Sequence, residues 1–502
     1  MSHYVCRALI SVLLAVLCAV SGLAQPKREM RAVWIATVWG IDWPGRAGNT
    51  AADADRQRAE LKAIIERAGR LNFTTVFFQV RGMSDAMFRS SLEPWSGFLT
   101  GRRGADPGWD PLEFAVNECH SRGLECYAWV NPFRWSSGTD YDTPSDRQFK
   151  QNGWLLRHGK YTVLNPGLEE VRAHVVDVCR EIVTGYAVDG LIFDDYFYPN
   201  HIPEDLSAPD YGLYMSQAPW MTLGDWRRAN VHKTVADVKA MIADSRPGCR
   251  FGISPAGVAG KAETSSSRWG AEPCGVKASD WQFDEIYSDP LGLLYQGTVD
   301  FVSPQLYWST THRTAPFGPL ARWWSGVANL YGVQFYSSLT LERLRQGDVA
   351  ANRRDLLRQI DISRQVSVDG TQGICIYSAK FLPDVERELS SAFVAPSLAP
   401  ACFHNLFDPD EPAQPRDVRL HNGTLEWRGN GPANTGQERY TVYAVPDGCK
   451  DFEDPEGDGI DGRFLCRVVY GRSFDVASRP RCRYAVCALS PEGVESRPAW
   501  CE

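Results

Sequence analysis

The sequence predicts a (β/α)8 barrel followed by a small all-β sandwich. From Met30 to Ser391, short runs rich in β-branched and aromatic residues alternate with helical periodicity, giving eight pairs in about 360 residues. Strand candidates such as Thr75–Phe78 are apolar on successive residues, which is typical of parallel strands covered on both faces. A doubly wound open sheet is the alternative, but the glycine-rich phosphate turn expected after its first strand is absent from the sequence.

The elements of the barrel follow in order along the chain. The predicted strands are Ala32–Val38, Thr74–Val80, Glu125–Val130, Gly190–Phe193, Arg250–Ser254, Phe301–Leu306, Val333–Ser338 and Gly373–Tyr377. The predicted helices are Asp55–Leu71, Leu112–Arg122, Leu168–Tyr186, Asp225–Ser245, Asp280–Tyr287, Leu320–Tyr331, Asn352–Val366 and Pro383–Ala392. The barrel domain is predicted to span residues 28–393.

Residues 1–24 have the pattern of a secretory signal peptide. Arg7 precedes the apolar run Ala8–Val20, and small residues follow at Ser21 and Ala24. The run is too short for a comfortable transmembrane helix. The sequence therefore predicts export to the periplasm, the cell envelope or the medium. A lipoprotein signal ending at Cys18 is the alternative.

The barrel pattern gives way to a linker and a β-rich domain. Residues 394–415 contain five prolines and are predicted to be a Pro-rich linker. Residues 416–502 are predicted to be a β-sandwich, with strands at Val418–Leu420, Thr424–Trp427, Tyr440–Ala444, Arg467–Val469 and Tyr484–Ala488. Five of the 14 cysteines lie in this domain. Because an exported chain meets oxidants, we expect some of the cysteines to pair.

Composition excludes several classes of function. The net charge of −8 argues against nucleic acid as a partner. Cysteine and histidine do not cluster at zinc spacing, and we predict no metal and no cofactor. The sequence has no GxSxG or HExxH, so neither a serine esterase nor a zinc protease is indicated.

Polar and aromatic residues gather where the predicted strands end. In such a barrel the active site lies at the carboxyl ends of the strands. The candidates for substrate contact there are Trp39, Asp42, Arg81, Asn131, Arg134, Tyr196, Ser254, Gln305, Tyr307 and Trp308. Their amides, cations and flat rings suit sugar hydroxyls and pyranose faces. This pattern also suggests a use for some of the 17 tryptophans.

Asp194 and Asp195, at the end of the fourth strand, are the candidate catalytic residues. Glycoside cleavage needs a proton donor and a second group that attacks or activates water. Two close carboxylates would separate in pKa, which would leave one protonated near neutral pH. A structural role, with one aspartate capping the turn or pairing with Arg81 or Arg134, is the alternative. The sequence leaves the proton donor open among Asp195, Asp289, Glu93 and Asp42.

Several strings resemble glycosyl hydrolase-like family 10, a family of exported bacterial barrel proteins. The matching strings are Arg28–Pro44, Phe78–Arg81, Leu92–Ser96, Trp109–Ala115, Ala128–Arg134, Leu164–Gly167, Val188–Pro199 and Ser303–Trp308. The resemblance covers residues 28–393 and implies a (β/α)8 glycosidase; one member cleaves peptide-free glycan strands of peptidoglycan. In some members a fibronectin type III-like domain follows the barrel. Ser254–Ala259 departs from the family pattern by lacking its aromatic residues.

We therefore expect an exported glycoside hydrolase that acts on a polysaccharide, with peptidoglycan glycan strands as the favoured substrate. A dietary or host polysaccharide is the alternative substrate. A non-catalytic glycan-binding protein of the cell envelope is the alternative function. In either case the C-terminal domain is expected to contribute to association with the envelope.

Overall fold

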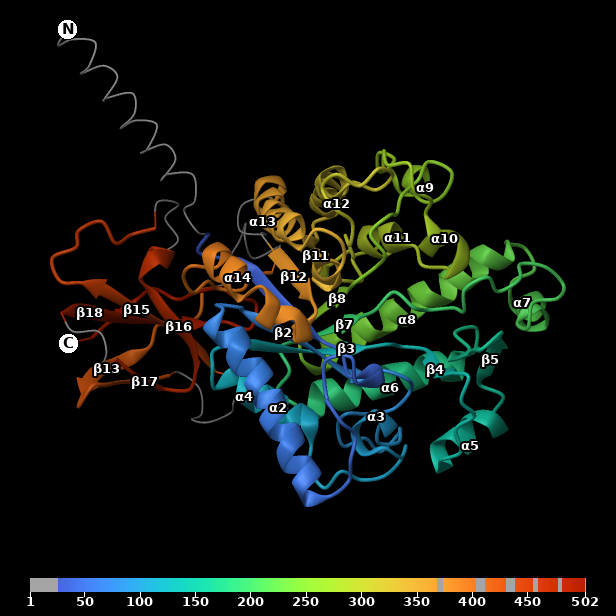
Figure 1. Ribbon diagram of the computed structural model, residues 1–502, viewed down its shortest axis with the longest axis horizontal. Coiled ribbons are helices and arrows are strands. Elements are labelled where there is room, and N and C mark those ends of the chain that lie inside the picture. Colours follow the sequence, from blue (N-terminus) through green and yellow to red (C-terminus); the bar gives the residue numbers. More distant parts are fainter. Residues whose placement is uncertain are drawn as a thin grey trace, which may run out of the picture.

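The computed structural model of the protein describes residues 26–367, 373–402, 411–429, 438–454, 459–476 and 481–501. Within these residues, parallel strands close into a barrel (Figure 1). Hydrogen-bonded neighbours run from β1 through β2, β3, β7, β8 and β9 to β10, and β11 pairs with β12, which returns to β1. Because β10 and β11 are halves of one strand separated by Tyr336, the ring has the eight positions that the sequence predicts.

The structure sets the bounds of these elements. The barrel strands are β1 (Met30–Ile35), β2 (Thr75–Arg81), β3 (Glu125–Val130), β7 (Gly190–Phe193), β8 (Arg250–Ile253), β9 (Phe301–Val302), β10 (Gln334–Phe335), β11 (Ser337–Thr340) and β12 (Gly373–Tyr377). The larger helices are α2 (Ala51–Arg70), α4 (Pro111–His120), α6 (Glu169–Gly185), α8 (Leu223–Ser245), α12 (Phe317–Leu330), α13 (Val349–Val366) and α14 (Glu386–Ala392). The shorter helices are α3 (Gly97–Thr100), α5 (Pro144–Gln151), α7 (Tyr211–Gln217), α9 (Ser266–Trp269), α10 (Trp281–Glu285) and α11 (Pro290–Tyr295).

Two apolar layers hold the barrel together. Alternate strand residues such as Phe77 and Ile192 fill the interior, and their neighbours pack outward against the helices. Burial on both faces accounts for the unbroken apolar runs in the sequence. The predicted strand Phe301–Leu306 is shorter than expected, because β9 ends at Val302 and Pro304 has no N–H to continue the ladder.

A small antiparallel sheet that the sequence did not predict follows β3. It consists of β4 (Arg134–Ser137), β5 (Leu155–His158) and β6 (Tyr161–Leu164), with β6 in the centre. Figure 1 shows this sheet and α7 at one end of the barrel, and the C-terminal strands at the other. The strands β4–β6 are only four residues long and join through an insertion, so their periodicity is too short to stand out in the sequence.

The C-terminal domain is a sandwich of two antiparallel sheets. One sheet has the order β13 (Arg416–His421), β14 (Thr424–Arg428) and β17 (Ser473–Asp475). The other has the order β16 (Leu465–Tyr470), β15 (Arg439–Pro446), β18 (Cys482–Leu489) and β19 (Ala499–Trp500). One apolar cluster contains Leu425 of the first sheet and Val442 and Val486 of the second, so the inner faces share a core.

The sandwich packs against the amino ends of the barrel strands. Arg439 forms a 2.6 Å ion pair with Glu125, the first residue of β3. His120, at the end of α4, stacks on Tyr470 with ring centroids 3.8 Å apart. At Gly123, whose φ is +71°, a Cβ atom would lie 2.1 Å from the Val468 carbonyl oxygen, so only glycine fits this contact. The domain therefore lies away from the carboxyl ends of the strands.

The barrel cysteines are buried, free thiols: Cys119, Cys126, Cys179, Cys249, Cys274 and Cys375. Burial raises the pKa of Cys179 and of Cys375 to about 12, so these side chains pack as small apolar groups. Among the described residues, no helix combines the length and the apolarity needed to cross a bilayer.

Candidate active site

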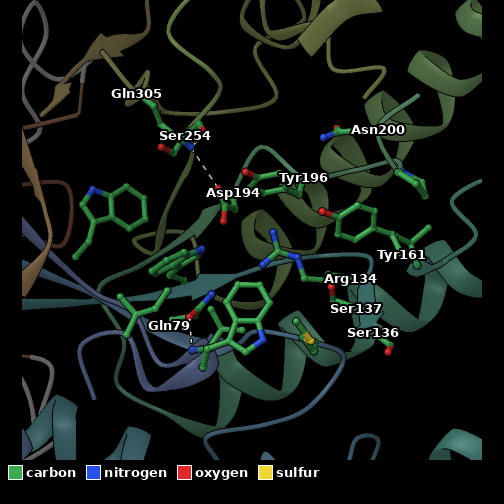
Figure 2. Close-up of a pocket in the computed structure, with 18 of the residues that line it drawn as sticks. Gln79, Arg134, Ser136, Ser137, Tyr161, Asp194, Tyr196, Asn200, Ser254 and Gln305 are labelled. Carbon is green, nitrogen blue, oxygen red and sulfur yellow. Dashed lines mark hydrogen bonds between the residues drawn. The ribbon is translucent and has the colours of Figure 1, made fainter. Parts of the chain in front are cut away.

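A cavity of about 450 Å³ opens at the carboxyl ends of the barrel strands. Its floor contains Trp34 and Trp129, which meet edge to face with ring centroids 5.0 Å apart. The antiparallel sheet contributes Ser136 and Tyr161 to one wall. The volume and the mixture of aromatic and polar walls are typical of a small-molecule or oligosaccharide site. Figure 2 shows Asp194 and Arg134 among the lining side chains.

Asp194 is held by three N–H donors. The Asn131 amide donates to Oδ2 at 2.8 Å, and the Asp195 backbone N–H donates to Oδ1 at 2.8 Å. The Gln305 amide reaches Oδ1 at 3.4 Å. Asp194 is 8% exposed and lines the cavity, so its orientation is set before a ligand arrives. Such a preorganised carboxylate can face positive charge that develops on a sugar ring.

Gln79 fixes the amide of Asn131. Its side-chain oxygen accepts hydrogen bonds from the Thr37 and Val38 backbone N–H groups, both at 2.9 Å. Its nitrogen donates to Asn131 Oδ1 at 2.8 Å, which leaves the Asn131 nitrogen to donate to Asp194. The chain of contacts crosses the first four strand positions of the barrel. Sequence reasoning did not select Gln79, although its polarity inside an apolar strand was the available signal.

Asp195 has a different environment from its neighbour. It is 3% exposed and lies outside the residues that line the cavity. Burial, and then the charge of Asp194, raise its pKa well above the usual range of a carboxyl. The raised pKa favours the protonated form of Asp195.

Arg81 lies outside the cavity lining and positions the chain after β3. Its guanidinium donates to the carbonyls of Asn131, at 2.5 Å, and Pro132, at 2.9 Å. Glu93 pairs with Arg81, and both side chains are fully buried. His174 contacts the same carboxylate at 2.9 Å. Burial alone would raise the pKa of Glu93, but the charges and hydrogen bonds of Arg81 and His174 outweigh it and hold the value at about 2.

The predicted site residues therefore divide into two groups. Those that line the cavity are Trp39, Arg134, Asp194, Tyr196, Ser254, Gln305 and Tyr307. Those outside the lining are Asp42, Arg81, Asn131, Asp195 and Trp308. Asn131 and Asp195 still bond Asp194 directly, and Arg81 supports Asn131. Trp308 instead lies against the backbone of Gly257, where a Cβ would be 2.7 Å from its ring.

The other carboxylates considered as proton donors have structural partners. Asp42 accepts from the Ala36 N–H and the Ser378 hydroxyl, both at 2.7 Å, and so ties β1 to the end of β12. Asp289 accepts from the Trp269 indole N–H at 2.7 Å and caps α11. Neither lines the cavity, and nor does Glu93.

Several lining residues were not selected from the sequence. They are Trp34, Val38, Ile41, Gln79, Met83, Trp129, Ser136, Ser137, Tyr161, Thr162, Val163, Tyr198, Pro199, Asn200, Glu342 and Tyr377. Trp34 packs in the barrel interior and also lines the cavity. Tyr161 and Ser136 reach the cavity only through the unpredicted sheet.

Arg134 stands between two exposed aromatic rings at the mouth of the cavity. Its guanidinium carbon lies 4.5 Å from the Tyr196 ring centroid and 6.0 Å from that of Trp39. These rings are 42% and 58% exposed. Within the described part of the chain, no carboxylate comes within ion-pair distance of Arg134, although its charge acts on Asp195. Exposed flat rings beside a cation can stack on a sugar and bind a polar substituent.

A (β/α)8 barrel with an oriented carboxylate and exposed aromatic rings at the carboxyl ends of its strands is the arrangement expected of a glycoside hydrolase. The chain belongs to the glycosyl hydrolase-like 10 family, whose sequence profile matches residues 29–352. It is 30% identical to "Glycosyl hydrolase YngK" of Bacillus subtilis over 84% of this chain and 83% of the relative. It is 33% identical to "Glycosyl hydrolase DigH" of Escherichia coli K12 over 69% of this chain and 83% of the relative.

Solved structures with similar folds are more distant. An α-L-fucosidase of Paenibacillus thiaminolyticus shares 9% identity and a TM-score of 0.46, over 91% of this chain and 74% of that one. An endo-β-1,4-mannanase of Thermotoga petrophila shares 10% identity and a TM-score of 0.42, over 93% of this chain and 99% of that one. The barrel class of this chain therefore rests on its own strand order, which closes through β1 and β12.

Proposed function

We propose that the protein is an exported hydrolase that cleaves the glycan strands of peptidoglycan. Membership of the glycosyl hydrolase-like family supports cleavage of a glycosidic bond. The observation that favours peptidoglycan over a neutral polysaccharide is Arg134, a guanidinium at the cavity with no carboxylate partner among the described residues. Muramic acid carries a lactyl carboxylate, which is free where the peptide has been removed. A guanidinium binds such a group through two parallel hydrogen bonds.

In this proposal Asp194 is the carboxylate that faces the anomeric carbon. Asn131, the Asp195 N–H and Gln305 orient it, so it meets the oxocarbenium-like transition state without reorganisation. Trp39 and Tyr196 stack on pyranose rings at the mouth, and Tyr307 lies along the wall. Asp195 assists indirectly, because its proton keeps a second negative charge away from Asp194.

The test uses the chain without residues 1–24, incubated with intact peptidoglycan, peptide-free peptidoglycan and chitin oligosaccharides, with soluble products identified by mass. Soluble sugars released from the peptide-free substrate support the proposal. Asp194→Asn should lower the rate at least about 1000-fold and leave glycan binding intact. Binding without cleavage by the wild type would instead support a glycan-binding protein, and cleavage of other polysaccharides alone would refute the peptidoglycan assignment.

Arg134 gives a second, more specific test. Arg134→Met should weaken cleavage of strands that contain muramic acid by about 10- to 100-fold, and should affect chitin oligosaccharides much less, because these lack a carboxylate. Arg134→Lys is the matched control, since it keeps the charge and loses the planar fork. Equal losses on both substrates would contradict recognition of a carboxylate.

We also propose that residues 1–24 direct export and that the C-terminal domain assists binding to the cell envelope. The basic, apolar and small-residue order of the N-terminal segment supports export. The strand orders β13-β14-β17 and β16-β15-β18-β19 support a fibronectin type III-like class for the sandwich. Cell fractionation of the native host tests both points, because a cytoplasmic protein would contradict export.

A further inference from the structure

A second carboxylate reaches the cavity from a place that the sequence did not suggest. Among the described residues that line the cavity, the carboxylates are those of Asp194 and Glu342. Asp194 follows β7, and Glu342 follows β11, the second half of the seventh strand position of the barrel. The two groups therefore approach from separate strand ends, as a pair that acts on opposite sides of one bond requires.

The backbone that carries Glu342 is firmly attached. The Leu341 N–H donates to the Tyr377 carbonyl at 2.7 Å, and Leu341 and Leu344 are buried. The Asn352 amide donates to the Arg343 carbonyl at 2.6 Å, which ties the same turn to α13. The Glu342 side chain itself is exposed, and no ion pair joins it to any described residue. Its carboxyl is thus available to a ligand on a fixed support.

Two stacked tyrosines line the same cavity as Glu342 and Asp194. The rings of Tyr307 and Tyr377 have centroids 5.8 Å apart and an interplanar angle of 27°. Burial raises the pKa of Tyr377, and the charges of Asp42, Glu342 and Asp194 raise it further. Both rings belong to the cavity lining, where a sugar ring can lie against them.

We propose that Glu342 is the general acid of the glycosidic cleavage. It gives its proton to the leaving oxygen as the bond between that oxygen and the anomeric carbon breaks, and the oxygen keeps the electron pair. Asp194 faces the anomeric carbon during this step. Over the full cycle, one water supplies the hydroxyl that ends on the anomeric carbon and the proton that restores Glu342. The inference rests on the proposed cleavage of a glycosidic bond and holds for any polysaccharide substrate.

Aryl glycosides with different leaving groups test this role, because dinitrophenolate leaves without a proton and a sugar or nitrophenolate benefits from one. The probe is a panel of 4-nitrophenyl and 2,4-dinitrophenyl glycosides of common hexoses, N-acetylglucosamine and N-acetylmuramic acid. Glu342→Gln should lower the rate on the 4-nitrophenyl substrate about 100- to 10,000-fold and on the dinitrophenyl substrate less than about 10-fold. It should also remove the basic limb of the pH profile, and Asp194→Asn should abolish both reactions.

The control is Glu263→Gln, an exposed carboxylate outside the cavity, which should behave as the wild type. A Glu342→Gln variant with full activity on both substrates, or with equal losses on both, would overturn the inference. If the wild type cleaves aryl glycosides but not peptidoglycan, the proposed substrate is refuted. The comparison of Glu342→Gln with the wild type on the aryl glycosides still decides the role of Glu342.

Discussion

Glu93→Gln tests how far a buried ion pair outside the cavity lining stabilises this protein. At neutral pH the change removes the charge that balances Arg81, and both side chains are fully buried. The shift of the Glu93 pKa from 4.5 to about 2 corresponds to roughly 3.4 kcal/mol of stability, at 1.36 kcal/mol per unit. Leaving the Arg81 charge buried without a partner typically costs about 3–5 kcal/mol, which is the same range.

The sign of the pH dependence follows from the direction of the shift. A carboxyl whose pKa is lowered on folding contributes its stability above the unfolded pKa, and the contribution falls as pH drops from about 4.5 toward about 2. At pH 3 the ionisation of Glu93 should still contribute about 1.4 of the roughly 3.4 kcal/mol that it contributes at neutral pH. The difference in free energy of unfolding between the wild type and Glu93→Gln should therefore shrink by more than half.

Urea unfolding, followed by tryptophan fluorescence at pH 7, 5 and 3, measures this difference. The control is Glu386→Gln, because Glu386 forms a 2.7 Å ion pair with Arg67 at the surface. This variant should lose less than about 1 kcal/mol of the free energy of unfolding. Equal stability of Glu93→Gln and wild type at pH 7, or a deficit that is the same at pH 7 and pH 3, would refute the reasoning. Because Arg81 holds the Asn131 and Pro132 carbonyls, activity should also fall in the folded variant.

Three further changes test other parts of the structure. Asn131→Ala removes a 2.8 Å donor to Asp194, so steady-state kinetics should show kcat/KM about 10- to 100-fold lower, with the loss mainly in kcat. Burial raises the pKa of Asp280 to about 7, so ionisation of this carboxyl destabilises the folded state as pH rises from about 4 to 7. Asp280→Asn should therefore raise the free energy of unfolding by up to about 4 kcal/mol at pH 8 and by little at pH 4, as measured by thermal or urea unfolding. Arg439→Met breaks the buried ion pair with Glu125 between the domains and should lower the free energy of unfolding, measured by calorimetry, by about 3–5 kcal/mol. Unchanged stability would show that the contact contributes little.

Much of the barrel could be predicted because its signals are local. Strands buried on both faces need continuous apolar residues, and Thr75–Phe78 shows this within four positions. The helix α2 (Ala51–Arg70) overlaps its predicted span, Asp55–Leu71, because a periodic apolar face marks it, but it begins four residues earlier, after the Thr50–Asp53 capping box. Strand ends are also local features, and this is why Arg134, Asp194, Tyr196, Gln305 and Tyr307 could be selected as cavity residues.

The arrangement within the site depended on contacts between distant segments. Asp194 and Asp195 are adjacent in sequence and both are buried, but only the packed barrel places Asp194 in the cavity lining and leaves Asp195 outside it. Gln79, Asn131 and Asp194 lie on different strand positions and meet because parallel strands present their carboxyl ends at one face. Glu342 carries no local sequence signal that distinguishes it from other exposed carboxylates.

Residue order alone was thus enough to specify the fold class, the succession of elements and the end of the barrel where the chemistry lies, because each depends on periodicity or on neighbours along the chain. Packing of the folded chain determines which side chains line the cavity, which carboxyl holds a proton and which arginine has no carboxylate partner among the described residues. Hydrogen bonds at the site join residues 52 to 111 positions apart in the chain, and their proximity exists only once the barrel has closed.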